Sequence, residues 1–403
     1  MKKVIALSTL LSSLLFAGGY RIPESSINSM ALSAAYVANA NGADSSYYNP
    51  ANMVFNEDRS LIEASLTYIN LSSIKYIDNN VSRNSSSKSE NFFIPTLFFS
   101  SKDYNNFRYG LSLTIPGGLS KRWDDTFAKT FAQEFTLEII ELNPSIAYKI
   151  RENFSVGGGF RIIYSKGVVK SDGVVYPPST TASRDMSGDT IEFGYNLATT
   201  YKPTNSINIS ATYRSNIDLK EEGNAKLFSD TSQKYNDKAS VTIPLPAVAS
   251  LALSYKFDKS IVEFEWDRTF WSTYKELDFE YESALSNPIL KAAFDDPKPK
   301  DWKDSDAFRV GITHKLNETV TLMAAVAIDQ NPVPDSTIMF ELPDSDAYLF
   351  SGGLNYKYSK DIELGAGFLY DSKKSRDVKT DELDGVFKDA SAYLLSAGVK
   401  YKF

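Results

Sequence analysis

Apolar and polar side chains alternate with a period of two from about Leu61 to the end of this 403-residue chain. The final segment shows the alternation clearly, because its two faces differ in character. One face holds Tyr393, Leu395, Ala397, Val399, Tyr401 and Phe403, and the other holds Ser396, Gly398, Lys400 and Lys402. A period of two predicts strands, and strands that are apolar outside and polar inside are typical of a transmembrane β-barrel.

Fourteen segments follow this pattern between residues that break strands. Their predicted spans are 60–74, 91–101, 106–116, 136–150, 153–169, 188–202, 206–220, 239–257, 260–280, 305–316, 319–329, 346–358, 361–373 and 390–403. Short turns alternate with long polar loops, for example 171–187, 221–238 and 282–304. We predict an all-β fold, a 14-stranded antiparallel transmembrane β-barrel over residues 59–403, with its short turns in the periplasm. A soluble β-sandwich would not sort its loops by length so cleanly.

Residues 1–17 have the features of a signal peptide. Lys2 and Lys3 precede a short apolar run, and small residues follow at Ala17 to Gly19. The run is too short to span a membrane comfortably as an anchor. We expect export, with cleavage near Ala17, and location of the mature chain in the bacterial outer membrane.

Residues 18–58 do not follow the strand pattern. They are rich in Ser, Asn and Ala, and their apolar residues recur at helical spacing between Ile27 and Ala38. A fourteen-stranded barrel is intermediate in width between filled barrels and open porins, so its lumen would leak unless something filled it. We predict that residues 18–58 form a partly helical hatch that plugs the lumen.

The charge, the absence of cysteine and the single histidine argue against several classes of function. The net charge of −7 argues against a nucleic-acid partner, and the chain has no cysteine for a disulfide or a thiolate site. The single histidine, His314, is expected on the outer face of a strand near a turn, where it suits a membrane interface better than a Ser–His–Asp triad. We expect no cofactor, no metal site and no enzymatic activity.

Alternation also places charged side chains in the predicted lumen. Glu263, Glu265 and Asp267 alternate with apolar residues, and Arg309 should face them from the next strand. Cross-strand ion pairs that line a wet wall are the simplest interpretation. A second role, in holding the hatch, stays open.

Several motifs, in order along the chain, resemble the FadL/TodX family of outer-membrane transporters for hydrophobic compounds. Gly19-Tyr20-Arg21 is similar to the start of the mature family chain, and Asn49, Pro50 and Ala51 are similar to the NPA motif of the family's hatch. Further similar segments are Gly118-Leu119-Ser120, Tyr213-Arg214-Ser215, Trp271-Ser272, Trp302-Lys303-Asp304 and Pro332-Val333-Pro334. The resemblance implies passive uptake of long-chain fatty acids or related hydrocarbons through a hatch-plugged barrel, with a sideways exit at a kinked third strand.

The third predicted strand contains Pro116, Gly117 and Gly118. Proline removes a donor from the strand ladder and glycine favours a bulge, so these residues are the predicted lateral gate. The simpler alternative is that the strand ends there and a loop begins.

Two apolar clusters fall in predicted long loops. Phe127, Phe131 and Phe135 recur every fourth residue, and Ile289, Leu290 and Phe294 belong to a second short helical stretch. Together they are the candidate extracellular hydrophobic groove. Alternatively, each stripe only packs its own loop onto neighbouring loops.

The expected partners are a hydrophobic small molecule (a fatty acid, an alkane or an aromatic hydrocarbon) and the lipid and lipopolysaccharide of the outer membrane. We expect a monomer. The alternative functions are a general diffusion porin and a structural outer-membrane barrel.

Overall fold

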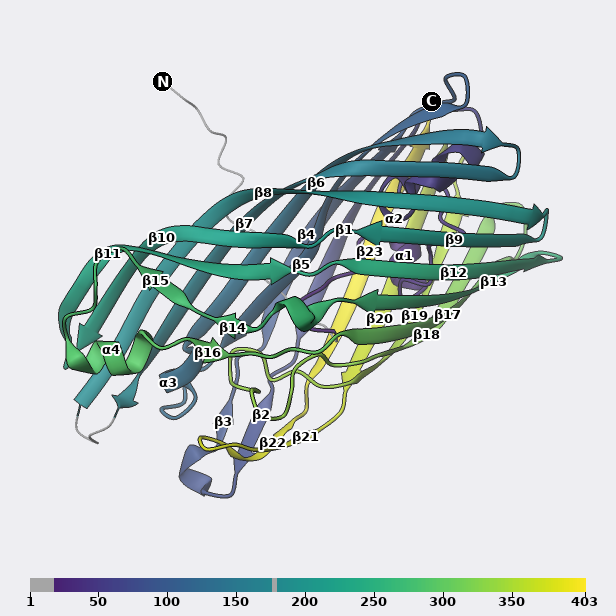
Figure 1. The fold of residues 1–403 in the computed structure, drawn as a ribbon. Helices are drawn as coiled ribbons and strands as arrows, with labels where there is room; N and C mark the ends of the chain where they lie inside the picture. The colour runs from purple at the N-terminus through teal and green to yellow at the C-terminus, as the bar shows by residue number, and fades with distance from the viewer. Residues whose placement is uncertain (1–17, 176–179) are drawn as a thin grey trace.

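The wall of the molecule is one closed sheet (Figure 1). The computed structural model describes residues 18–175 and 180–403, so the predicted signal peptide, residues 1–17, lies outside the described residues. The sheet closes because β1 (Leu61–Leu71) pairs antiparallel with both β4 (Glu90–Ser100) and β23 (Ser391–Lys402).

The described residues contribute seventeen segments to this sheet. The other fourteen segments are β5 (Phe107–Arg122), β6 (Glu134–Arg151), β7 (Phe154–Val175), β8 (Thr180–Thr204), β9 (Ile207–Arg214), β10 (Ile217–Ser229), β11 (Ser232–Leu245), β12 (Val248–Phe257), β13 (Ser260–Thr269), β15 (Phe279–Tyr281), β17 (Ser305–Lys315), β18 (Val320–Asp329), β19 (Ala347–Lys357) and β20 (Ile362–Lys373). Three of the barrel strands are each divided into two segments, namely β9 with β10, β11 with β12 and β13 with β15, so the seventeen segments form fourteen strands. The predicted fourteen-stranded antiparallel barrel is therefore confirmed.

The two ends of the barrel differ, as Figure 1 shows. Short turns join the strands at one end, for example between β12 and β13, and between β19 and β20. The connections on the other side contain short elements, which are α3 (Lys129–Ala132), α4 (Pro288–Phe294), η2 (Val81–Arg83), η3 (Trp271–Thr273), a two-stranded sheet of β14 (Glu276–Leu277) and β16 (Lys298–Pro299), and a four-stranded sheet of β2 (Lys75–Asp78), β3 (Ser85–Ser86), β21 (Arg376–Lys379) and β22 (Asp384–Lys388). We call the end with the short turns the short-turn end and the opposite end of the barrel the long-loop end.

Outward-facing side chains form an apolar band around the strands. Ile191, Phe193 and Leu197 of β8 are 60%, 57% and 56% exposed, and similar residues face outward from the neighbouring strands. Lipid contact stabilises such a band, whereas water would not. Every helix within residues 18–175 and 180–403 is too short or too polar to cross a membrane.

Two of the predicted long loops are strands. Residues 171–187 belong mostly to β7 and β8, and residues 221–238 form the hairpin of β10 and β11, with its turn at Asp230 and Thr231. The prediction was wrong because the apolar side chains change faces along these strands. Ile209 of β9 faces outward, 46% exposed, whereas Leu219 of β10 is completely buried on the inside. Beyond the apolar band the outer face meets water, so strands continue there with polar side chains outside and apolar side chains inside.

Candidate functional site

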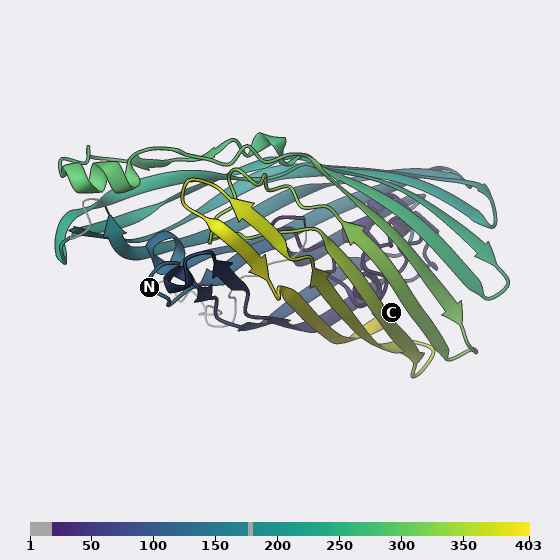
Figure 2. The ribbon, with the colours of Figure 1, turned by 90° about the horizontal axis from the view of Figure 1, so that it is seen from below.

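The N-terminal segment, residues 18–58, lies inside the ring of strands (Figure 2). It contains α1 (Ile27–Ala31), α2 (Ser45–Tyr48) and η1 (Pro50–Phe55). α1 packs against β18, β19, β20 and β23, α2 packs against β4, β5 and β6, and η1 packs against β5 to β8. The segment thus reaches most of the wall, and most of its side chains are buried.

The helical spacing expected from Ile27 to Ala38 does not give one helix. α1 ends at Ala31, and the chain then turns through Ser33 and Ala34, whose φ angles are 46° and 63°. Positive φ is unfavourable for residues with a Cβ, so contacts with the wall must hold this turn. Arg309 of β17 supplies one of them, because its Nη1 donates to the carbonyl of Ser33 at 3.0 Å.

Asn49, Pro50 and Ala51 join the N-terminal segment to the wall. Asn49 Nδ2 lies 2.9 Å from both the carbonyl of Val37 and Oγ1 of Thr200 on β8, and Pro50 begins η1. These contacts fix the path of the chain where two turns of the segment meet the strands.

Gly157 of β7 lets the segment approach the wall closely. A Cβ at this position would lie 2.6 Å from the Ala51 nitrogen and 2.8 Å from the Pro50 carbonyl carbon. The neighbouring Ser155 Oγ donates to the Ala51 carbonyl at 2.8 Å. The glycines at 157–159 lie within a strand, as predicted, and Gly157 serves close packing there.

Glu263 and Glu265 of β13 face the lumen and bind backbone N–H groups. Glu265 Oε2 accepts from Tyr36 and Val37 at 2.9 and 3.0 Å, and Glu263 accepts from Ala38 and Asn39 at 2.6 and 2.9 Å through its two oxygens. Their partners are the N-terminal segment rather than cations on the next strand. The open alternative from the sequence, that these carboxylates hold residues 18–58, matches this geometry better than cross-strand ion pairing.

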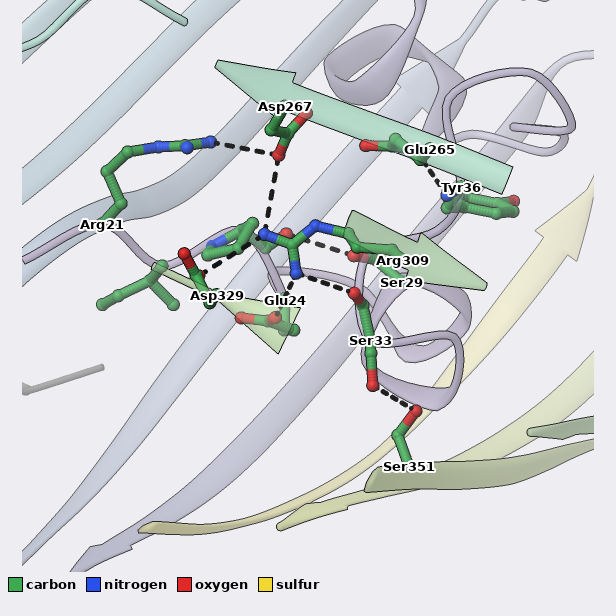
Figure 3. Close-up of polar contacts among 12 residues, drawn as sticks. Arg21, Glu24, Ser29, Ser33, Tyr36, Glu265, Asp267, Arg309, Asp329 and Ser351 are labelled. Atoms are coloured by element: carbon green, nitrogen blue, oxygen red, sulfur yellow. Dashed lines mark hydrogen bonds and ion pairs between the residues drawn. The ribbon is translucent and has the colours of Figure 1, made fainter. Parts of the chain in front are cut away.

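Asp267 and Arg309 do make a cross-strand pair, drawn in Figure 3. Arg309 Nη2 lies 3.5 Å from Asp267 and 3.7 Å from Asp329 of β18, and Nη1 lies 3.8 Å from Glu24. Arg21 approaches Asp267 from the other side at 3.8 Å. Arg309 is 1% exposed, so removing this buried cation would leave Asp267 to Arg21 and would take away the ion-pair partner of Glu24 and Asp329.

The wall loses its regular pairing between β4 and β5. These strands pair only from Leu97 with Leu113 to Ser100 with Gly110, and contact resumes where the Lys88 N–H donates to the Arg122 carbonyl at 2.9 Å. On its other side β5 shifts register against β6 between Thr114 and Gly117. Pro116, Gly117 and Gly118 lie in this stretch, and the strand continues through them to Arg122 rather than ending there.

The start of the N-terminal segment occupies the inner side of this break. The Ile22 N–H donates to the Pro116 carbonyl at 2.9 Å, and the Gly118 N–H donates to the Tyr20 carbonyl at 2.8 Å. The Tyr20 ring packs edge-on against Trp271, with centroids 4.6 Å apart, and its hydroxyl donates to the Pro244 carbonyl.

The lumen above the N-terminal segment contains two neighbouring spaces that share lining residues. An inner pocket of about 20 Å³ is lined by Tyr20, Leu119, Ile243, Tyr274, Trp302 and Leu342. An outer cavity of about 510 Å³ at the long-loop end is lined by Phe131, Phe135, Arg184, Phe279, Phe294 and Met339. Phe135, Met339 and the ion pair of Lys300 with Glu341 border both spaces. Burial raises the pKa of the Tyr274 hydroxyl, so it stays neutral beside the inner pocket.

The six residues of the predicted hydrophobic groove separate into two sets. Phe131, Phe135 and Phe294 line the outer cavity, whereas Phe127, Ile289 and Leu290 pack within the core around it. Of the three phenylalanines expected on one helix, only Phe131 lies in α3, which runs from Lys129 to Ala132, and Phe135 lies in β6. Loops distant in sequence complete the cavity, which helical spacing within one loop could not indicate.

Sequence reasoning missed Arg184, Lys300 and the role of Tyr20. Tyr20 drew notice only as part of a family motif, and Arg184 falls in a stretch expected to be a loop. The change of apolar faces along β8 was the available signal for Arg184.

Comparisons with known proteins agree with this architecture. A model of the family described as "Outer membrane protein transport protein (OMPP1/FadL/TodX)" matches residues 8–403. The long-chain fatty acid transport protein of Escherichia coli K12 is 24% identical, covering 98% of this chain and 96% of its own. A crystal structure of a Pseudomonas aeruginosa FadL homologue superposes with a TM-score of 0.86 at 21% identity, covering 96% of this chain and 100% of its own. The Pseudomonas putida toluene transporter TodX superposes with a TM-score of 0.72 at 17% identity, covering 93% and 98%.

Proposed function

Since the chain belongs to the OMPP1/FadL/TodX family of outer-membrane transport proteins, we propose that it takes up hydrophobic small molecules passively and releases them sideways into the membrane. The relatives are named for two kinds of cargo, long-chain fatty acids and toluene. Both need an apolar path and neither needs a water-filled pore. We propose that the protein acts as a monomer among outer-membrane lipids and lipopolysaccharide, and that it transports its ligand without transforming it.

In the proposed route a ligand first enters the outer cavity from the extracellular, long-loop end. It then passes Phe135 and Met339 into the inner pocket and reaches Tyr20. Residues 18–58 act as the hatch, because they fill the lumen below this point and force the ligand sideways. The side exit is the stretch at Pro116–Gly118, where β5 lacks β4 as a partner.

The observation that carries this proposal is the placement of the β4–β5 break beside the inner pocket. Leu119 lines the inner pocket and lies next to Gly118 at the break. Unpaired backbone in contact with lipid costs several kcal/mol per group, so a wall would not retain such a stretch without a use or a cover. The Tyr20 to Ile22 stretch covers it from inside, as a gate would.

Uptake by the full-length protein and by a variant that lacks residues 18–58 tests the proposal. We expect cells with the wild-type protein to take up labelled oleate or toluene, and liposomes with it to exclude small sugars. The deletion variant should admit sugars, because the lumen is then open. A difference in gel migration between heated and unheated samples of the deletion variant verifies that the shortened protein still folds into a barrel.

Two results would contradict the proposal. Ready sugar permeation through the wild-type protein would favour a general diffusion porin. Unchanged conductance and unchanged ligand uptake in the deletion variant would show that residues 18–58 are not a hatch.

A further inference from the structure

A small niche on the inner side of the wall contains one buried carboxylate. The niche measures about 30 Å³, and Glu221 of β10 is the only charged residue among the described residues that line it. Phe135 borders the niche, the inner pocket and the outer cavity, and Ile243 borders both the niche and the inner pocket. The niche therefore lies beside the path that a ligand follows in the proposed route.

One oxygen of this carboxylate has no partner. Glu221 is 3% exposed, and its Oε1 accepts a hydrogen bond from the hydroxyl of Ser165. Its Oε2 is buried without a hydrogen-bond partner among residues 18–175 and 180–403. A buried acceptor that lacks a donor is destabilising, so a donor bound in the niche would relieve a cost.

Glycines from three neighbouring strands line the niche beside Glu221. Gly188 of β8 is paired with Gly167 of β7 on one side and with Gly223 of β10 on the other. Gly223 follows Glu221 by two positions, so the two residues lie on the same face of β10. The Glu221 side chain lies over Gly167, where an added Cβ would be 3.8 Å from Cδ and 3.9 Å from Oε2. Because these three positions carry no side chain, the space beside the carboxylate stays open.

The size and the charge of the niche restrict what it can bind. A water molecule needs roughly 10–15 Å³ of such space, so the niche admits a small head group but not a hydrocarbon chain. Glu221 would repel a carboxylate. A hydroxyl group is both a donor and an acceptor, so it can pair with a carboxyl group that is either ionised or protonated. Val169, Met186 and Phe279 supply apolar contacts for the adjoining part of a ligand.

We propose that Glu221 binds the hydroxyl group of an otherwise apolar ligand, an aliphatic alcohol or a phenol, while the apolar part of the ligand stays in the lumen beside Phe135. This inference rests on the proposed function and adds a polar specificity to it. It makes Glu221 the residue by which this protein prefers an alcohol to the hydrocarbon with the same chain.

Binding of oleyl alcohol and of cis-9-octadecene to the full-length protein in lipid nanodiscs tests the inference, with empty nanodiscs as the blank. The two probes share one chain and differ only in the hydroxyl group. We expect Glu221→Leu to weaken oleyl alcohol binding roughly tenfold to hundredfold, as the loss of a hydrogen bond to a charged group predicts. Binding of cis-9-octadecene should stay nearly unchanged. Glu221→Gln should restore much of the preference, because its amide keeps an acceptor oxygen.

Gly167→Ala tests the niche and leaves the carboxylate in place. The new methyl group would meet the Glu221 side chain at an ordinary contact distance of 3.8 Å, so we expect the barrel to fold and the niche to be filled. Oleyl alcohol binding should weaken severalfold, and cis-9-octadecene binding should not.

Glu222→Leu is the matched control. Glu222 is the next residue of β10, but it is exposed on the outer face and pairs with Lys220 at 3.1 Å. The inference is overturned if Glu221→Leu affects both probes equally or neither, or if Glu222→Leu has the same effect as Glu221→Leu. If the wild-type protein takes up oleate or toluene but binds oleyl alcohol no more tightly than cis-9-octadecene, this inference fails and the proposed function stands. If it takes up neither oleate nor toluene, the proposed function fails as well.

Discussion

The backbone N–H of Gly118 donates to the carbonyl of Tyr20 across 2.8 Å, so the first described residues of the chain pair with a wall strand that lacks its neighbour. The same tyrosine puts its ring into the inner pocket, against Trp271. One short stretch therefore separates the pocket from the break in the wall. In the proposed route, displacement of this stretch connects the pocket with the break.

Replacing Tyr20 by alanine should join the inner pocket to the wall break. We expect oleate uptake to become severalfold faster, because the ring that blocks the path is removed while the backbone pairing at Gly118 remains. Tyr20→Phe is the control, since it keeps the ring contact and loses only the hydroxyl bond to Pro244. Transport rates in cells measure the effect, and equal rates for alanine and phenylalanine would contradict the proposed gate.

Gly117→Ala should displace the N-terminal stretch from β5. The new Cβ would lie 2.7 Å from the Tyr20 carbonyl oxygen, closer than a backbone contact allows. We expect faster uptake and faster proteolysis near Arg21. Gly352→Ala is the matched control, because its Cβ would meet only the Met323 oxygen at an ordinary 3.5 Å. If the Gly117 variant resisted proteolysis near Arg21 as well as the wild-type protein does, the close contact between Gly117 and Tyr20 would be contradicted.

Arg309→Met should loosen the proposed hatch, residues 18–58, while the barrel remains folded. Breaking a buried ion pair on one side costs about 3–5 kcal/mol, and Arg309 serves Glu24, Asp267 and Asp329 together. Hydrogen exchange of residues 21–38 should accelerate on the order of a hundredfold or more. Lys75→Met removes an exposed pair with Asp389 and should leave exchange there unchanged. If the amide hydrogens of residues 21–38 still exchanged slowly in the Arg309 variant, contacts other than those of Arg309 would hold this segment in place.

Gly157→Val should push η1 away from β7, because its side chain needs space that Pro50 and Ala51 occupy. We expect liposomes with this variant to swell in small sugars. Ser155→Ala removes one hydrogen bond to Ala51, worth about 1 kcal/mol, and should leave the lumen closed. If liposomes with the Gly157 variant still excluded small sugars, residues 18–58 would be able to repack around the new side chain, and the prediction would be wrong.

Strand positions were largely predictable because side-chain alternation is a local property of the extended backbone. The predicted spans 319–329 and 361–373 match β18 and β20 to within one residue. The error at 221–238 has a physical cause, since apolar side chains do not face outward along the whole length of these strands. Ser215 and Asn216 separate β9 from β10, and beyond them the apolar side chains lie on the inner face of the strand instead of the outer face.

The candidate site was only partly predictable. Glu263, Glu265 and Arg309 were expected in the lumen, and they lie there. Their partners could not be read from the sequence, because Glu265 binds Tyr36 across 229 positions and Arg309 binds Ser33 across 276. The grouping of Phe135 with Phe294 likewise depends on loops that meet only in the folded barrel.

By itself, the sequence determined a closed barrel of fourteen strands, its sidedness and the presence of a non-strand segment before it. These follow from side-chain period and from the need to satisfy every backbone group in lipid. Only the tertiary structure decided that Tyr20 pairs with Gly118, that β4 leaves β5 unpaired there, and that Phe131, Phe135 and Phe294 line one cavity. Those features depend on which distant surfaces come into contact, and no local pattern encodes that.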